Sequence, residues 1–209
     1  MRTSLALAYV FVRGAGGWTQ QAYLKASNTQ LGAFFGYTVA IANETVAIGA
    51  PMEGGDAAGI VGDPRFAGSG AVYLFRRAAS AWSQEAYVKA ANLGGAARFG
   101  HAVSLSGATL AVGAPQEASN ARGVNGDASD RSLVSAGAGY VFAHGSSGWA
   151  QRAYVKASNT HVSQFGFSVA LAGEELAVGA PSESSGATGV GGDQTSRSAG
   201  GAGAAYVYH

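Results

Sequence analysis

Residues 35–51 read FGYTVAIANETVAIGAP, and two near-copies follow, FGHAVSLSGATLAVGAP at 99–115 and FGFSVALAGEELAVGAP at 165–181. Each copy holds two short apolar runs joined by a tight turn, at Asn43 in the first copy and at a glycine in the others. Asn and Gly tolerate the positive φ that two-residue hairpins need. The second run is apolar at nearly every position, which is typical of a strand buried on both faces. The stretch therefore predicts a β-hairpin that the chain uses three times.

The hairpin is part of a longer repeat of about 66 residues. One tyrosine marks the same slot in four runs such as AVYLF: Tyr9, Tyr73, Tyr140 and Tyr206. Each unit holds four short runs rich in Val, Ala, Tyr and Phe, without the apolar spacing of a helix and with Gly between them. A fixed period indicates one supersecondary unit that is copied. We predict an all-β fold of four-stranded antiparallel sheets stacked as the blades of a β-propeller.

The paired FG and GAP motifs, followed by GAVYLF-type strands, resemble the FG-GAP repeats of integrin α-chain N-terminal β-propellers and their bacterial relatives. The resemblance covers nearly the whole chain and implies a strand order within each blade: FG strand innermost, GAP strand second, tyrosine strand third, tryptophan-led strand outermost. It also implies a structural role for the signature residues Phe35, Gly36, Gly49, Pro51, Phe99, Gly100, Gly113, Pro115, Phe165, Gly166, Gly179 and Pro181. Integrin repeats often hold a calcium loop between the FG and GAP strands. The corresponding connections here, ANE, SGA and AGEE, lack Asp, so that site is not carried over.

With that strand order, residues 1–209 form a single propeller segment of about three blades. Strands three and four of a split blade fall at 5–28, complete blades at 35–92 and 99–159, and strands one to three of a split blade at 165–209. Propellers typically close with four to eight blades, and an open end exposes apolar faces and unpaired strand edges. We therefore expect oligomerisation to complete the ring, most simply as a six-bladed homodimer with strand exchange between chains. A larger ring, an open filament and a fragment of a longer propeller are the alternatives.

Composition excludes several function classes. A formal net charge of +1 gives no electrostatic footprint for nucleic acid, and the sequence has no apolar run of the ~20 residues that a membrane helix requires. The absence of cysteine excludes disulfides and thiolate sites. The N-terminal stretch LALAYVFVR superficially resembles a signal peptide, but it matches the third strand of the repeat in phase, and we interpret it as a strand. An extracellular or cell-surface location follows from the resemblance alone.

Motifs of common catalytic sites are absent from the sequence, and its polar residues repeat with the blades. A catalytic site needs an asymmetric set of acid, base or nucleophile. We therefore expect no catalytic residues and no enzyme, and favour a structural or interaction module that binds protein or glycan. The alternative is an enzyme that uses the axial cavity of the propeller.

Two carboxylate slots recur in the long loops after the GAP motifs. A glutamate stands two residues past each proline and an aspartate ten residues later: Glu53 and Asp63, Glu117 and Asp127, Glu183 and Asp193. One interpretation is a cage of hard oxygen ligands for Ca²⁺. The other, which we favour, is that these carboxylates accept hydrogen bonds from loop amides and pair with Arg65, Arg131 or Arg197. Ca²⁺ is thus the only cofactor that the sequence suggests.

One lysine also recurs at the end of each tryptophan-led run: Lys25, Lys89 and Lys156. These runs are expected to be the outer strands of the blades. Lysine on an edge strand commonly opposes aggregation. We therefore expect a surface role for all three.

Overall fold

The computed structural model describes residues 6–56, 67–92 and 94–209. This part of the chain consists of strands, turns and loops and contains no helix. The all-β prediction and the antiparallel four-stranded sheets are therefore confirmed. No helix in the described ranges is long and apolar enough to cross a membrane.

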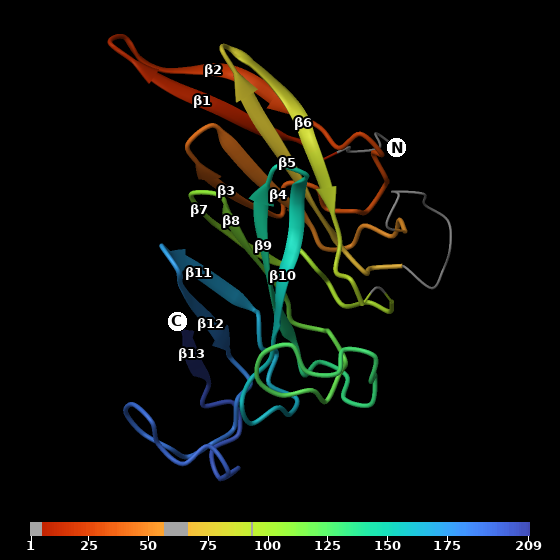
Figure 1. Cartoon of the computed structure of the whole chain (residues 1–209), viewed down its shortest axis with the longest axis vertical. Helices are drawn as coiled ribbons and strands as arrows, with labels where there is room; N and C mark the ends of the chain where they lie inside the picture. The colour runs from red at the N-terminus through yellow and green to blue at the C-terminus, as the bar shows by residue number, and fades with distance from the viewer. Residues whose placement is uncertain (1–5, 57–66, 93) are drawn as a thin grey trace.

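Four antiparallel sheets follow one another along the chain (Figure 1). The N-terminal hairpin pairs β1 (Ala8–Gly14) with β2 (Gly17–Leu24). The first complete sheet has the order β3 (Thr38–Ala42), β4 (Thr45–Ala50), β5 (Ala71–Ala78) and β6 (Ala81–Val88). The second complete sheet has the order β7 (Ala102–Ser106), β8 (Thr109–Ala114), β9 (Ala138–Gly145) and β10 (Gly148–Val155). The C-terminal sheet has the order β11 (Ser168–Ala172), β12 (Glu175–Ala180) and β13 (Ala204–Tyr208).

The FG and GAP runs form the expected hairpins. Asn43 turns the first with a φ of 52°, and Gly107 and Gly173 turn the others with φ values of 57° and 63°. Strands β4 and β8 are buried on both faces, as the apolar sequence predicts. Strand β12 is buried on one face only, because its other face is not covered by a following sheet in the described residues.

Successive sheets stack through their FG strands, because β7 contacts β3 on one side and β11 on the other. Side chains alternate along these strands. Val103 and Leu105 on one face of β7 pack toward the preceding sheet, in the same apolar cluster as Ala40 of β3. On the other face of β7, the hydroxyl of Ser104 accepts a hydrogen bond of 3.0 Å from the amide of Leu171. Each FG strand thus presents branched apolar side chains to the preceding sheet and small side chains to the following sheet.

The glycines of the two motifs set the spacing between sheets. A Cβ built on Gly49 of one GAP motif would overlap the carbonyl oxygen of Gly100 in the next FG motif, and Gly113 stands in the same relation to Gly166. Only glycine allows the two backbones to approach so closely. The FG phenylalanines meet the strand-three tyrosines edge to face, with ring centroids 5.2–5.3 Å apart, in the pairs Phe35–Tyr73, Phe99–Tyr140 and Phe165–Tyr206.

Candidate functional site: the buried glutamates and their loops

The three glutamates occupy the same position in three repeats. Glu53, Glu117 and Glu183 each follow a GAP strand, where the glutamate amide donates to a carbonyl three residues earlier and turns the chain. The turn directs each carboxylate inward, and all three side chains are buried. A buried carboxylate is stable only when its oxygens are hydrogen-bonded or paired with a cation.

The carboxylate of Glu117 has a full set of donors. Its Oε1 accepts from the Ser119 amide at 3.1 Å and from Asn92 Nδ2 at 3.2 Å. Its Oε2 accepts from Lys156 Nζ at 2.7 Å. Lys156 Nζ also donates to the Ser119 carbonyl at 2.7 Å. A loop amide, an asparagine and a lysine thus converge on one buried glutamate.

Glu53 in the first complete sheet has an equivalent set. It accepts from the Gly55 amide at 2.8 Å, from Asn28 at 3.2 Å and from Lys89 at 2.8 Å. The hydroxyl of Tyr87 adds a fourth bond, of 2.9 Å, to Oε2. The network is therefore a repeated feature of the fold.

The asparagine joins each sheet to the one before it. Asn92 follows the last strand of the first complete sheet, but its side chain bonds two groups of the second: Nδ2 donates to Glu117, and Oδ1 accepts from the hydroxyl of Tyr140 at 2.8 Å. The other two copies of the tyrosine–asparagine bond are Tyr73–Asn28 at 2.6 Å and Tyr206–Asn159 at 2.5 Å. The asparagines hold successive sheets in register, and the sequence interpretation missed them.

The surface role expected for the lysines is wrong for Lys89 and Lys156. Lys89 is 8% exposed and Lys156 is 0% exposed. Burial lowers the pKa of both ammonium groups, and the paired glutamates oppose that shift. Each lysine follows the outermost strand, but the loop after the GAP strand folds back over it. Lys25, the equivalent residue after β2, is half-buried and has no ion-pair partner in the part of the chain that the structure describes.

Glu183 has no lysine partner among the described residues. The Ser185 amide donates to both carboxylate oxygens at 3.0 Å, the Ser185 hydroxyl donates to Oε2 at 2.8 Å, and Asn159 donates at 3.0 Å. His161 Nε2 lies 3.3 Å from Oε1. Burial by itself raises the pKa of Glu183, but the bonds from Ser185, His161 and Asn159 outweigh it and leave the pKa lowered.

Comparison with known families matches residues 18–75 and 82–142 to the FG-GAP repeat. Each match runs from the tryptophan that opens an outer strand to the tyrosine strand of the next sheet. The chain belongs to the FG-GAP repeat family. The identification made from the motifs is thus confirmed. A comparison with curated proteins finds no match.

Asp127 and Asp193 of the FG-GAP loops accept hydrogen bonds within their own loops. Asp127 accepts from the hydroxyl and amide of Ser129 at 2.6 and 2.9 Å, and Asp193 accepts from Thr195 in the same way at 2.7 and 2.8 Å. These bonds lower the pKa of both aspartates. Asp63 lies outside the described residues. Within the described residues, no three or more His, Cys, Asp or Glu side chains are grouped closely enough to hold a metal ion.

Of the three arginines expected to pair with these carboxylates, the structure describes Arg131 and Arg197. Arg131 donates to the carbonyls of Asn92 and Gly94, at 3.3 Å each. Arg197 has no ion-pair partner among the described residues, and Arg65 lies outside them. Arg131 therefore holds its loop against the preceding sheet through backbone carbonyls.

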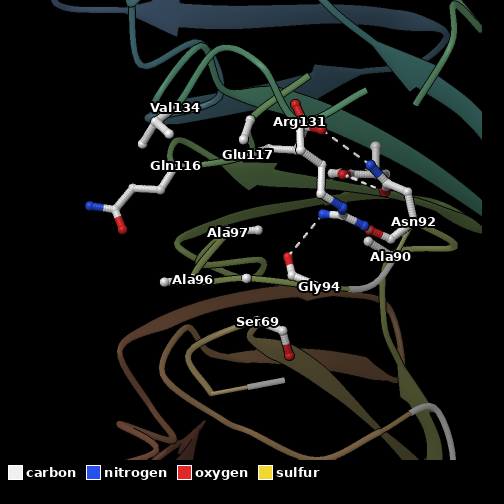
Figure 2. A pocket seen from close by; sticks show the side chains of 13 residues that line it. Ser69, Ala90, Asn92, Gly94, Ala96, Ala97, Gln116, Glu117, Arg131 and Val134 are labelled. Carbon is white, nitrogen blue, oxygen red and sulfur yellow. Dashed lines mark hydrogen bonds between the residues drawn. The ribbon is translucent and has the colours of Figure 1, made fainter. Parts of the chain in front are cut away.

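A pocket of about 200 Å³ opens beside Glu117, where the loops of the two complete FG-GAP sheets meet (Figure 2). Ser69 comes from one sheet, and Gln116, Glu117 and Val134 from the next. The guanidinium of Arg131 reaches across the pocket to the segment around Gly94. The polar groups at this junction are used to join the two sheets.

Proposed function

We propose that this FG-GAP chain is a non-enzymatic structural or interaction module whose β-propeller is completed by a second copy of the chain. The observation that carries the proposal is that the first complete sheet and the C-terminal sheet each expose one half of the junction seen between successive sheets within the chain. The repeated polar residues, which join loops to strands, favour a structural role over catalysis.

The first half of the junction is the free face of β3. Val39 and Ile41 are 59% and 63% exposed, whereas Val103 and Leu105 in the same slots of β7 pack against the preceding sheet. A groove of about 230 Å³, lined by apolar residues of β1–β4, borders this face. Branched apolar side chains in such a row are typical of a surface that another sheet covers.

The second half is the free face of the C-terminal sheet. Ala170 and Ala172 of β11 are exposed, in the slots where Ser104 and Ser106 of β7 accept hydrogen bonds from β11 and the turn after it. Gly179 of β12 meets no backbone of a following FG motif in the described residues. A second copy would bring its FG glycine, Gly36, to this place. The two free faces therefore have the complementarity of the internal junctions.

Strand β13 offers an open edge, since it pairs with β12 alone in the described ranges. Its equivalents β5 and β9 each pair with a tryptophan-led outer strand. We propose that β2 of a second copy takes that position beside β13. Strand β1 now occupies the same edge of β2, and β1 and β13 are both strand-three copies, so the exchange replaces one antiparallel ladder with an equivalent one. The exchange leaves β1 as a surplus third strand, and closed two-fold symmetry then gives a homodimer of six four-stranded blades.

The same faces could build a larger ring or an open filament, and we propose the dimer because it is the smallest closed assembly. The long loops at one rim would then form a repeated surface for a protein or glycan ligand. We propose an extracellular or cell-surface setting, on the basis of the family resemblance. A role as an enzyme with an axial site has no specific observation in its favour.

Disulfide cross-linking tests the exchange, because the chain contains no native cysteine. In the complete sheets, Leu74 faces Ala86 across the outer pair of strands, and Ala22 and Val207 occupy the corresponding slots of β2 and β13. We expect chains with Ala22→Cys and chains with Val207→Cys to form a cross-linked dimer when they are mixed and oxidised. The pair Thr19→Cys and Val207→Cys, three residues out of register, is the matched control. A monodisperse monomer in light scattering, or equal cross-linking of both pairs, would overturn the proposal.

A further inference from the structure

In the second complete sheet, two side chains of the outer-strand segment reach the loop that carries the buried glutamate. The hydroxyl of Tyr154 lies 2.6 Å from that of Ser119. Lys156 Nζ donates to Glu117 Oε2 and to the Ser119 carbonyl, at 2.7 Å each. A Tyr-x-Lys segment at the end of the outer strand thus secures a Glu-x-Ser loop of its own sheet.

The C-terminal sheet has the loop without the outer strand. Glu183 and Ser185 occupy the slots of Glu117 and Ser119, and both are buried. The Ser185 hydroxyl is turned onto Glu183 Oε2, at 2.8 Å, where the lysine binds in the complete sheets. The serine therefore fills the position of the absent cation.

The N-terminal hairpin has the segment without the loop. Tyr23 and Lys25 follow in phase with Tyr154 and Lys156. Tyr23 is 63% exposed, whereas Tyr154 is buried. Lys25 has no ion-pair partner among the described residues. Within the described residues, the N-terminal hairpin thus holds a cation without an ion pair, and the C-terminal sheet holds a buried carboxylate without a lysine.

We propose that Tyr23 and Lys25 of a second copy bind the Glu183–Ser185 loop, an inference that rests on the assembly proposed above. Lys25 Nζ donates to Glu183 Oε2 and to the Ser185 carbonyl, and the Ser185 hydroxyl rotates to face the hydroxyl of Tyr23. His161 stays on Oε1, on the other oxygen of the carboxylate. The partner copy completes the network by supplying two of its side chains.

The pair would determine the register of assembly. A slip of one residue between β2 and β13 would turn Lys25 to the opposite face of the sheet and leave Glu183 without its cation. We infer that this buried pair contributes to the specificity of the assembly, because a misaligned partner would leave Glu183 without its cation. The buried ion pair thus helps to distinguish a correct partner from a misaligned one.

Charge exchange across the interface tests this pairing in the chain of residues 1–209. We expect Lys25→Glu and Glu183→Lys, each alone, to raise the dimer dissociation constant in sedimentation equilibrium by at least about tenfold, because like charges would meet in the interface. The double variant, Lys25→Glu with Glu183→Lys, should recover most of that loss. Arg152→Glu makes the same charge reversal at an exposed position of β10 and should leave the dissociation constant unchanged.

Because Glu183 is buried, each variant also needs a circular dichroism spectrum and a thermal melt. Lys25→Met provides a second test that changes no buried carboxylate, and we expect it to weaken the dimer as well. Unchanged dissociation constants for Lys25→Met and Lys25→Glu in a dimeric protein would overturn the pairing and leave the proposed assembly standing. A wild-type chain that stays monomeric would overturn both.

Discussion

The backbone of Gly113 in β8 lies directly against the carbonyl group of Gly166 in the next repeat, leaving no space for a Cβ between them. The same contact joins Gly49 to Gly100 one repeat earlier. The GAP glycine of one sheet and the FG glycine of the next are thus two sides of one contact. Gly179 has the GAP position but meets only the hydroxyl and neighbouring atoms of Ser168 in its own sheet.

Alanine substitutions at Gly113 and at Gly179 should therefore have different effects. We expect Gly113→Ala to lower the free energy of unfolding by about 1–3 kcal/mol, because the new methyl group would push two backbones apart. Gly179→Ala meets a serine side chain that can rotate, and should cost much less in a dilute, monomeric sample. It should still weaken self-association, since the methyl group would occupy the place of Gly36 from a second copy. Urea denaturation and light scattering measure the two effects, and equal losses of stability would contradict this account.

The asparagines that join successive sheets provide a second prediction. Asn92→Ala would remove one donor from Glu117 and the acceptor of the Tyr140 hydroxyl, both of them buried. Leaving buried polar groups without partners costs about 1–3 kcal/mol. We expect a loss of that size in urea denaturation. Asn120→Ala, at an exposed position of the next loop, is the matched control and should change stability little. A similar loss for both variants would show that Asn92 has no special role.

Lysine substitutions at equivalent positions test the buried ion pairs. Lys156→Met would leave Glu117 charged and buried without its cation, and removing one partner of such a pair costs about 3–5 kcal/mol. Lys25→Met removes a half-buried lysine that has no ion-pair partner in the described residues. In a dilute sample we expect it to change the free energy of unfolding far less. A small effect of Lys156→Met would contradict the assignment of Lys156 as the cation that stabilises the Glu117 carboxylate.

The sequence predicted the architecture well because each type of strand recurs in several repeats of the chain. Asn43 and Gly107 marked the hairpin turns, and the unbroken apolar GAP run marked a strand buried on both faces. The same periodicity led to a wrong prediction of a surface role for Lys156. It placed the residue correctly at the end of an outer strand, but it carried no information on the loop that folds back to cover it. That contact joins residues 39 positions apart and depends on the tertiary path of the loop.

The in-phase recurrence of a second polar residue was the signal that could have revealed the network. Asn28 and Asn92 each stand 25 residues before a buried glutamate, at the same point of the repeat. A polar side chain that repeats with the core is expected to bond within the core. The function of the loops could not be read in this way, because ligand contacts on a rim need not repeat with the strands.

The lowered pKa of Glu183 gives a prediction for acid stability. At a pH near the ordinary glutamate value of 4.5, the folded chain holds fewer protons at this site than the unfolded chain does. Stability from Glu183 is therefore fully present above the unfolded pKa and is lost as the pH falls through the lower, folded pKa. The cause is the set of donors from Ser185, His161 and Asn159, which favour the carboxylate.

Glu183→Gln should remove this dependence, because glutamine does not titrate. We expect the free energy of unfolding to fall less steeply on acidification in the variant than in the wild type, measured by urea denaturation at a series of pH values. Asp127 and Asp193, whose pKa values are also lowered, contribute equally to both chains and cancel in the comparison. Glu174→Gln, at an exposed position before β12, is the control and should reproduce the wild-type slope. Parallel slopes for Glu183→Gln and the wild type would show that the Ser185 and His161 bonds do not stabilise the charged form.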